Sequence, residues 1–76
     1  MYHSQSADAV EQRQILLQIR DILLELGYDP VRQIAGYLLS EDPTYIPDHC
    51  NARALIEKID REFLLSTLVR GYLATK

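Results

Sequence analysis

GYDPVRQIAGYLLSEDPTYIP, residues 27–47, holds all three prolines and two of the three glycines of the chain. In Asp29-Pro30 and again in Asp42-Pro43, an aspartate that can accept hydrogen bonds at a helix N-cap precedes a proline. The missing N–H of proline costs nothing at the first helical position. Gly27 can adopt the left-handed conformation that closes a preceding helix, and Pro47 disfavours helical geometry in the residue before it. The stretch therefore predicts a helix end, a corner, a short helix, a second corner and a single turn.

The residues before Gly27 predict one long helix, from about Asp8 to Leu26. Its core-facing side is more than one stripe wide, as a packed helix requires, and consists of Ile15, Leu16, Ile19, Ile22, Leu23 and Leu26. A second apolar stripe lies nearly opposite and consists of Val10, Leu17 and Leu24, seven residues apart. Either the domain's own C-terminal helix covers this stripe, or a second subunit does, since heptad spacing is typical of packed helix pairs. We expect a subunit contact, because so short a chain has little intramolecular cover to spare.

Three further helical segments are expected around the single turn. The first runs from about Pro30 to Leu39, the second from an N-cap at Asn51 to Ile59, and the last from Arg61 to Ala74 with Asp60 as its cap. No glycine or proline forces a break between Ile59 and Asp60, so a continuous helix there stays open. No segment alternates with period two, so we expect no strands.

The sequence thus predicts an all-α bundle of about five helical segments, three of them substantial. Residues 1–6 read as a disordered tail and residues 7–76 as a single helical domain.

Length and composition point to support from a second chain. A domain of 76 residues buries only about 60% of its unfolded surface and is usually marginal alone. Cys50 is the single cysteine, so no internal disulfide can form and a reducing, cytoplasmic setting is expected. The chain shows no secretion signal and no apolar run of membrane-spanning length. A net charge of −3 does not favour nucleic-acid binding, which depends on clustered Lys and Arg.

Candidate chemical sites are weak. His49 and Cys50 are adjacent, so their side chains diverge, and the sequence offers neither a second pair of metal ligands nor an orienting group for a Cys–His nucleophile. We therefore expect no catalytic residues, metal, cofactor or small-molecule substrate. Ser4 and Ser6 in the tail are candidate phosphate acceptors, or simply solvated serines. Gly36 lies inside the second expected helix at a cost of about 1 kcal/mol relative to alanine. Either a backbone or a bulky ring comes close there, or the cost is simply borne.

The central stretch resembles the IreB/ReoM family of small regulatory proteins from Firmicutes. The residues that carry the resemblance are Gly27, Tyr28, Pro30, Gln33, Gly36, Tyr37, Asp42, Pro43, Tyr45 and Pro47, followed by Ala52 and Arg53. The resemblance continues more loosely through Leu68-Val69 and Tyr72-Leu73, so that it covers about two-thirds of the chain. This many fixed Gly, Pro, Tyr and Asp positions make it far more specific than a short motif.

The resemblance implies an all-helical, non-enzymatic homodimer. Members of this family are substrates of a membrane Ser/Thr kinase with extracellular PASTA repeats. In the unphosphorylated state they promote degradation, through the ClpCP protease, of the enzyme that commits sugar nucleotides to peptidoglycan synthesis. Phosphorylation of a threonine in the N-terminal tail relieves this effect and alters cell-wall output and cephalosporin resistance.

The sequence departs from the family pattern in two places. No threonine precedes Thr44, so a kinase acting on the tail would have to use Ser4 or Ser6. Asp48 and Glu57 stand where family members tend to carry basic residues, whereas Arg53 and Arg61 remain as candidate partner-binding residues. A phosphate at the start of the first helix would add about −1.5 to −2 charges, which either favour the positive end of that helix or dock onto one of these arginines.

Two functions are therefore carried forward. The leading hypothesis is a dimeric, non-enzymatic adaptor that touches the kinase and proteolysis-adaptor proteins. The alternative is a dimeric helix-turn-helix-like DNA-binding regulator, which the short helix, corner and second helix allow. The acidic balance of the chain counts against that alternative.

Overall fold

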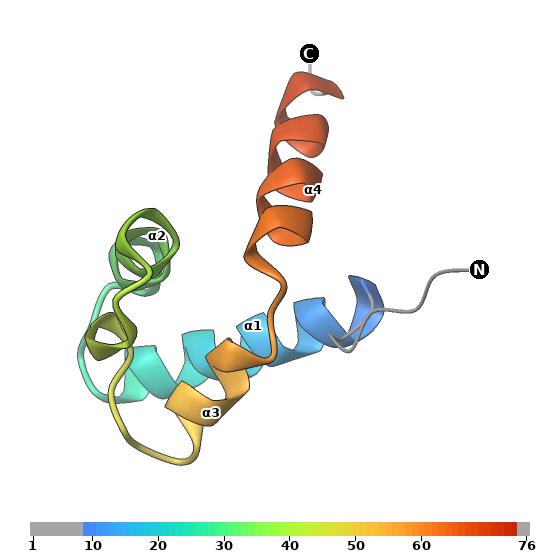
Figure 1. The fold of residues 1–76 in the computed structure, drawn as a ribbon. Helices are drawn as coiled ribbons and strands as arrows, with labels where there is room; N and C mark the ends of the chain where they lie inside the picture. Colours follow the sequence, from blue (N-terminus) through green and yellow to red (C-terminus); the bar gives the residue numbers. More distant parts are fainter. Residues whose placement is uncertain (1–8, 75–76) are drawn as a thin grey trace.

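The computed structural model describes residues 9–74, which form α-helices and a single 3-10 turn and contain no strand. The elements are α1 (Ala9–Glu25), α2 (Pro30–Ser40), η1 (Pro43–Tyr45), α3 (Ala52–Glu57) and α4 (Arg61–Ala74). The predicted all-α fold is confirmed, with α1, α2 and α4 as the three substantial helices. The predicted tail and the Asp8 cap lie outside the described residues. In Figure 1, α1 runs across the lower half of the molecule, and it packs against both α2 and α3.

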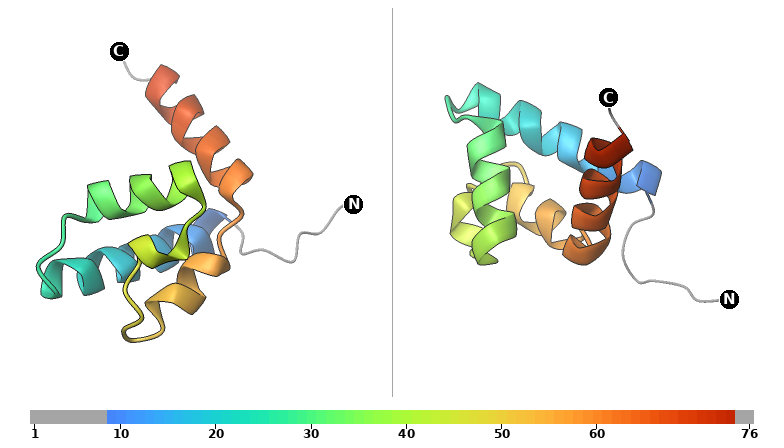
Figure 2. Two further views of the ribbon diagram at one scale, coloured as in Figure 1. Left: turned by 60° about the vertical axis from the view of Figure 1, so that its left-hand side comes forward. Right: turned by 90° about the horizontal axis from the view of Figure 1, so that it is seen from above.

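The corner between α1 and α2 forms as predicted. Gly27 adopts a φ of 88°, in the left-handed region. Its N–H donates to the carbonyl of Leu24 at 3.0 Å, and the N–H of Tyr28 donates to the carbonyl of Leu23 at 2.9 Å. This pair of bonds satisfies carbonyls that the end of a helix leaves unpaired. The chain then turns, so that α2 crosses α1 and packs against it (Figures 1 and 2).

Both Asp-Pro pairs begin a helix. Asp29 Oδ1 accepts from the backbone N–H of Val31 at 3.0 Å, and Asp42 Oδ1 accepts from that of Thr44 at 3.0 Å. Each proline occupies one of the first helical positions. The repeated device therefore works as the sequence predicts, once for α2 and once for the turn η1.

The interior glycine of α2 marks a close approach. A Cβ added to Gly36 would lie 2.5 Å from Cε1 and 2.9 Å from Cζ of Tyr45, so the ring lies directly on the helix backbone. Gln33, one turn earlier, donates from Nε2 to the carbonyl of Tyr45 at 2.8 Å. Of the two interpretations of Gly36, the close ring is the one observed. These contacts hold η1 against α2.

We predict that Asp42 stabilises the fold above a defined pH. The hydrogen bonds from the backbone and hydroxyl of Thr44, helped by the nearby charge of Arg53, lower the pKa of Asp42 below its ordinary value of 3.8. A carboxyl whose pKa is lower in the folded state contributes stability above its unfolded pKa and loses it as the pH falls through the folded value. In urea titrations, Asp42→Asn should therefore be less stable than the unmodified chain at pH 7.

The difference between Asp42→Asn and the unmodified chain should shrink below the ordinary pKa of 3.8. Asp48→Asn, which changes another exposed aspartate, serves as the control and should show no such closing gap. A gap between the Asp42→Asn and unmodified midpoints that is independent of pH would contradict the assignment.

The entry into α3 differs from the prediction. Asn51 was expected to cap this helix, but its side chain makes no capping hydrogen bond and its φ is 62°. Cys50 also has a positive φ, of 51°. The chain enters α3 through two successive left-handed residues, and asparagine tolerates that conformation better than most residues. Asn51 thus occupies the predicted N-cap position, and its carbonyl accepts from the N–H of Leu55 at 2.9 Å, but the expected side-chain cap does not form.

The helical conformation is interrupted between α3 and α4. Helix α3 ends at Glu57, and Asp60 caps α4 by accepting from the N–H of Phe63 at 3.2 Å through Oδ1. Figures 1 and 2 show α4 rising from the body formed by the other helices. Of its residues only Leu64 is buried, whereas Leu65, Leu68 and Tyr72, which share its apolar face by helical spacing, are exposed. Helix α4 therefore presents most of its apolar surface to solvent.

The core lies where α1 meets α2, η1 and α3. It is built from aliphatic residues together with one tyrosine and one alanine: Ile15, Ile19, Leu23, Tyr37, Leu38, Ile46, Ala52, Ile56, Ile59 and Leu64. Ile46, just before Pro47, is fully buried. The second corner thus fixes a core residue as well as turning the chain.

Candidate interaction surface

An apolar groove of about 490 Å³ opens between three helices. Helix α1 forms one side, α2 a second, and the start of α4 a third. The lining is aliphatic apart from one arginine and consists of Leu16, Leu17, Arg20, Leu24, Pro30, Val31, Ile34, Ala35, Leu38, Leu64 and Leu68. We call this feature the groove. Its composition suits an apolar protein segment and offers few groups for a polar ligand.

The second stripe of α1 lies at and beside the groove. Leu17 and Leu24 line it, and Leu24 is 56% exposed, whereas Val10 near the start of the helix is 68% exposed. Within one chain, α4 therefore leaves Val10 and Leu24 uncovered. The first of the two interpretations of this stripe is that the C-terminal helix covers it. For Val10 and Leu24 the structure shows no such cover. What covers them in solution stays a prediction.

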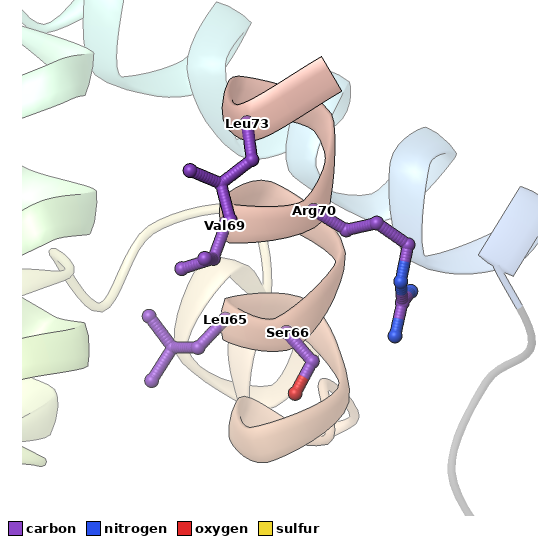
Figure 3. Close-up of a pocket in the computed structure, with 5 residues that line it drawn as sticks. All are labelled: Leu65, Ser66, Val69, Arg70 and Leu73. Carbon is purple, nitrogen blue, oxygen red and sulfur yellow. The ribbon is translucent and has the colours of Figure 1, made fainter.

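Helix α4 adds a ridge to the same side of the molecule. Leu65, Val69 and Leu73 project from one side of the helix, one turn apart, and Arg70 points away from them (Figure 3). All three are exposed. We call them the α4 ridge. Exposed aliphatic residues in a continuous row on a helix are typical of a surface that packs against another protein segment.

The two candidate partner-binding arginines make contacts inside the chain. Arg53 donates from Nε to the carbonyl of Ile46 at 2.9 Å, and Arg61 donates from Nη1 to the carbonyl of Leu38 at 2.9 Å. Arg61 also forms an ion pair with Glu41 through Nη2. These bonds tie α3 to the second corner and the start of α4 to the end of α2. Both guanidinium groups therefore have structural roles, which the sequence pattern does not reveal.

The other candidates fall in different places. Ser4 and Ser6 lie outside the described residues. His49 and Cys50 are exposed, and within residues 9–74 no three His, Cys, Asp or Glu side chains come together in a way that could hold a metal ion. None of the helices in this part of the chain has both the length and the apolar character needed to cross a membrane.

A buried amide escapes the sequence analysis. Gln12 on α1 is only 3% exposed, and its Oε1 has no hydrogen-bond partner among residues 9–74. It lies beside a pocket of about 290 Å³ that Phe63 and Thr67 of α4 also line. In the sequence, Gln12 stands one turn before Ile15 and Leu16, on the extension of the apolar face. A polar residue near the start of a helix is expected to be exposed to solvent, and only the packing of the chain shows that Gln12 is buried.

Replacing Gln12 with methionine is expected to raise the free energy of unfolding by about 0.5–1.5 kcal/mol. A buried acceptor without a partner carries a desolvation cost, and an apolar side chain of similar length removes that cost. The change would appear as a higher urea midpoint. Gln14→Met, which alters an exposed glutamine on the same helix, should leave the midpoint nearly unchanged. Loss of stability in Gln12→Met would show that the amide has a partner in solution.

The family model described as IreB regulatory phosphoprotein matches residues 1–74. The match extends well beyond residues 27–53, where the sequence resemblance is strongest, and takes in α1 and α4 with their open apolar surfaces. No described feature favours the DNA-binding alternative, because the most open surface of the described helices is aliphatic rather than basic.

Proposed function

Because the chain belongs to the IreB regulatory phosphoprotein family, we propose that it is a non-enzymatic regulatory adaptor that acts as a homodimer. The observation that carries the proposal is the groove together with the α4 ridge: one chain has both an open apolar channel and an exposed apolar helix. A protein with these features acts through contact with other chains, and the described residues gather no catalytic group that would suggest another mode of action.

A second copy of the chain suits the groove. Its lining and the α4 ridge have the same aliphatic chemistry, and they come from elements that the core does not fully occupy. In a two-fold dimer each contact occurs twice. Full burial of one Leu or Val side chain contributes about 1.5–3 kcal/mol. Association at micromolar concentration requires about 8 kcal/mol after an association cost of about 4–15 kcal/mol, so several such residues must be buried on each chain. The stripe of Val10, Leu17 and Leu24 then becomes part of the subunit interface.

Phosphorylation supplies the regulation. The candidate acceptors, Ser4 and Ser6, precede α1, whose first residues border the side pocket that Phe63 also lines. A phosphate there adds about −1.5 to −2 charges. That charge favours the positive end of α1 or competes with Glu41 for Arg61, since Glu41 is exposed and holds the guanidinium only as a surface ion pair. In either case the surface offered to a partner changes.

The proposed setting is the control of cell-wall precursor synthesis in the cytoplasm. The proposed partners are those that the resemblance to the IreB/ReoM family implies, a PASTA-domain Ser/Thr kinase and components of ClpCP proteolysis. The regulated outputs are peptidoglycan synthesis and cephalosporin resistance. The direct contact is proposed to use the apolar surface that the dimer leaves open, and Arg53 and Arg61 stay candidates for polar contacts to the partner.

Two experiments test the proposal. Light scattering over a dilution series should show a dimer at micromolar concentration, and a monomer up to millimolar concentration would reject the homodimer. Incubation with the catalytic domain of a PASTA kinase and Mg-ATP, followed by mass spectrometry, should place phosphate within residues 1–8. Phosphate absent from this segment would reject the switch in the tail but would leave the dimer untouched.

A further inference from the structure

Residues 41–51 form the longest run without α-helix in the described part of the chain. Thr44 stands near the middle of this run and is exposed. Its Oγ1 donates to Asp42 Oδ1 at 2.7 Å, and its N–H donates to the same oxygen at 3.0 Å. The residue therefore has an accessible hydroxyl in the short 3-10 turn η1, outside any α-helix, and that hydroxyl is part of the second corner.

The other serine and threonine hydroxyls of residues 9–74 are placed differently. Ser66 and Thr67 lie inside α4, and Ser40 is the last residue of α2, where its Oγ donates to the carbonyl of Gly36 at 2.7 Å. An acceptor must leave its local hydrogen bonds and enter a kinase site together with its neighbours. A short 3-10 turn opens at less cost than the interior of a helix. Among the described hydroxyls, that of Thr44 is the most available.

We propose that Thr44 is a phosphorylation site whose modification releases the second corner from α2. A Ser/Thr kinase would transfer the γ-phosphoryl group of Mg-ATP to Oγ1. The bond from the γ-phosphorus to the β–γ bridging oxygen breaks, a bond from Oγ1 to phosphorus forms, and ADP leaves. The hydroxyl proton passes to the carboxylate base of the kinase. Asp42 serves poorly as that base, because its own hydrogen bonds favour the charged form.

The physical effect of the phosphate follows from what surrounds Oγ1. Modification removes the hydroxyl proton that Asp42 accepts and brings a group of about −1.5 to −2 charges next to its carboxylate. The cation close by is Arg53, whose Nε donates to the carbonyl of Ile46. If the phosphate attracts this guanidinium, Ile46 loses that bond. Repulsion from Asp42 and recruitment of Arg53 therefore both weaken the same turn.

Weakening the turn reaches the groove through α2. Tyr45 packs on Gly36, and the carbonyl of Tyr45 accepts from Gln33, so that η1 holds one side of α2. The opposite side of α2, with Val31 and Ile34, lines the groove. Phosphate on Thr44 would thus alter a wall of the proposed dimer surface without touching that surface. This last step rests on the proposed function, whereas the modification and the loosening of the turn do not.

The test uses the whole chain, which at 76 residues is within reach of chemical synthesis with phosphothreonine at position 44. Hydrogen exchange at the amides of Tyr45 and Ile46 should be about five- to tenfold faster than in the unmodified chain, as expected for the loss of one or two net hydrogen bonds. The core amides of Ile19 and Leu23 should keep their rates. A chain with phosphothreonine at position 67 is the matched control and should leave the turn unchanged.

Enzymatic labelling provides the second arm. The catalytic domain of a PASTA kinase with Mg-ATP should phosphorylate Thr44, and Thr44→Val should abolish that label while Thr67→Val keeps it. Phosphate confined to Ser4 and Ser6 would reject Thr44 as an acceptor but would leave the proposed switch in the tail. Unchanged exchange in the synthetic chain would reject the loosening. A monomeric unmodified chain would count against the proposed dimer only.

Discussion

Replacing Leu68 with arginine is expected to weaken self-association by about 100-fold or more. Leu68 lines both the groove and the side pocket next to Gln12, and it is 52% exposed in the single chain. Losing the burial of one leucine removes about 1.5–3 kcal/mol, and a symmetric interface loses it twice. An arginine without a partner adds a desolvation cost. Because each 1.4 kcal/mol is a factor of ten, sedimentation over a dilution series should show the variant as a monomer where the unmodified chain is a dimer.

A matched variant separates the interface from general surface effects. Leu39→Arg introduces the same side chain on α2 at a residue that is 87% exposed and lines neither the groove nor the side pocket. We expect its dissociation constant to change by less than about threefold, as for most surface substitutions. Circular dichroism should show equal helix content in both variants. Equal weakening by both substitutions, or none by Leu68→Arg, would place the interface elsewhere.

Replacing Gly36 with alanine is expected to lower the free energy of unfolding by about 1–2 kcal/mol, although alanine favours helix. The new Cβ would lie 2.5 Å from Cε1 of Tyr45, closer than real carbon atoms approach. Overpacking costs about 1–3 kcal/mol, and the gain in helix propensity returns up to about 1 kcal/mol. Tyr45 is 40% exposed, so its ring can move outward, which limits the loss. Urea denaturation followed by circular dichroism measures the difference.

Gly71 provides the control in the same chain. It also lies inside a helix, but nothing stands within 4 Å of an added Cβ. Gly71→Ala should therefore raise the free energy of unfolding by about 0.5–1 kcal/mol, a change of opposite sign to that of Gly36→Ala. In a Tyr45→Ala background the penalty of Gly36→Ala should disappear, since the ring that it meets is gone. If Gly36→Ala and Gly71→Ala changed the free energy of unfolding in the same direction, Tyr45 would not pack on α2 in solution.

The corners could be predicted from the sequence because their causes are local. Gly27, Asp29 and Asp42 act on backbone groups within five residues of themselves, and the structure shows the expected hydrogen bonds at each of them. The ring near Gly36 could be anticipated as well, because an interior glycine raises the question of what comes close. The identity of that ring could not be predicted, since Tyr45 reaches α2 only through the second corner and the turn η1.

The remaining features depend on packing between distant segments. The apolar face of α4 reads as a core face, but the break before Asp60 leaves all of it except Leu64 open. Arg53 and Arg61 look like free surface cations, but each donates to a carbonyl at least seven residues away. Gln12 reads as exposed, and the arrangement of α1 and α4 buries it. In each case the surroundings of the residue come from another helix, and periodicity carries no information about that helix.

The link between α3 and α4 separates the residues that stabilise the fold from the residues that are available to bind a partner. The core is complete by Leu64, so the remaining turns of α4 add helix propensity but no buried side chain to the folding equilibrium. The direction in which α4 points is set by the residues around Asp60 and by the guanidinium of Arg61. Substitutions on the exposed side of α4 can therefore change which protein binds there while the melting temperature stays nearly constant.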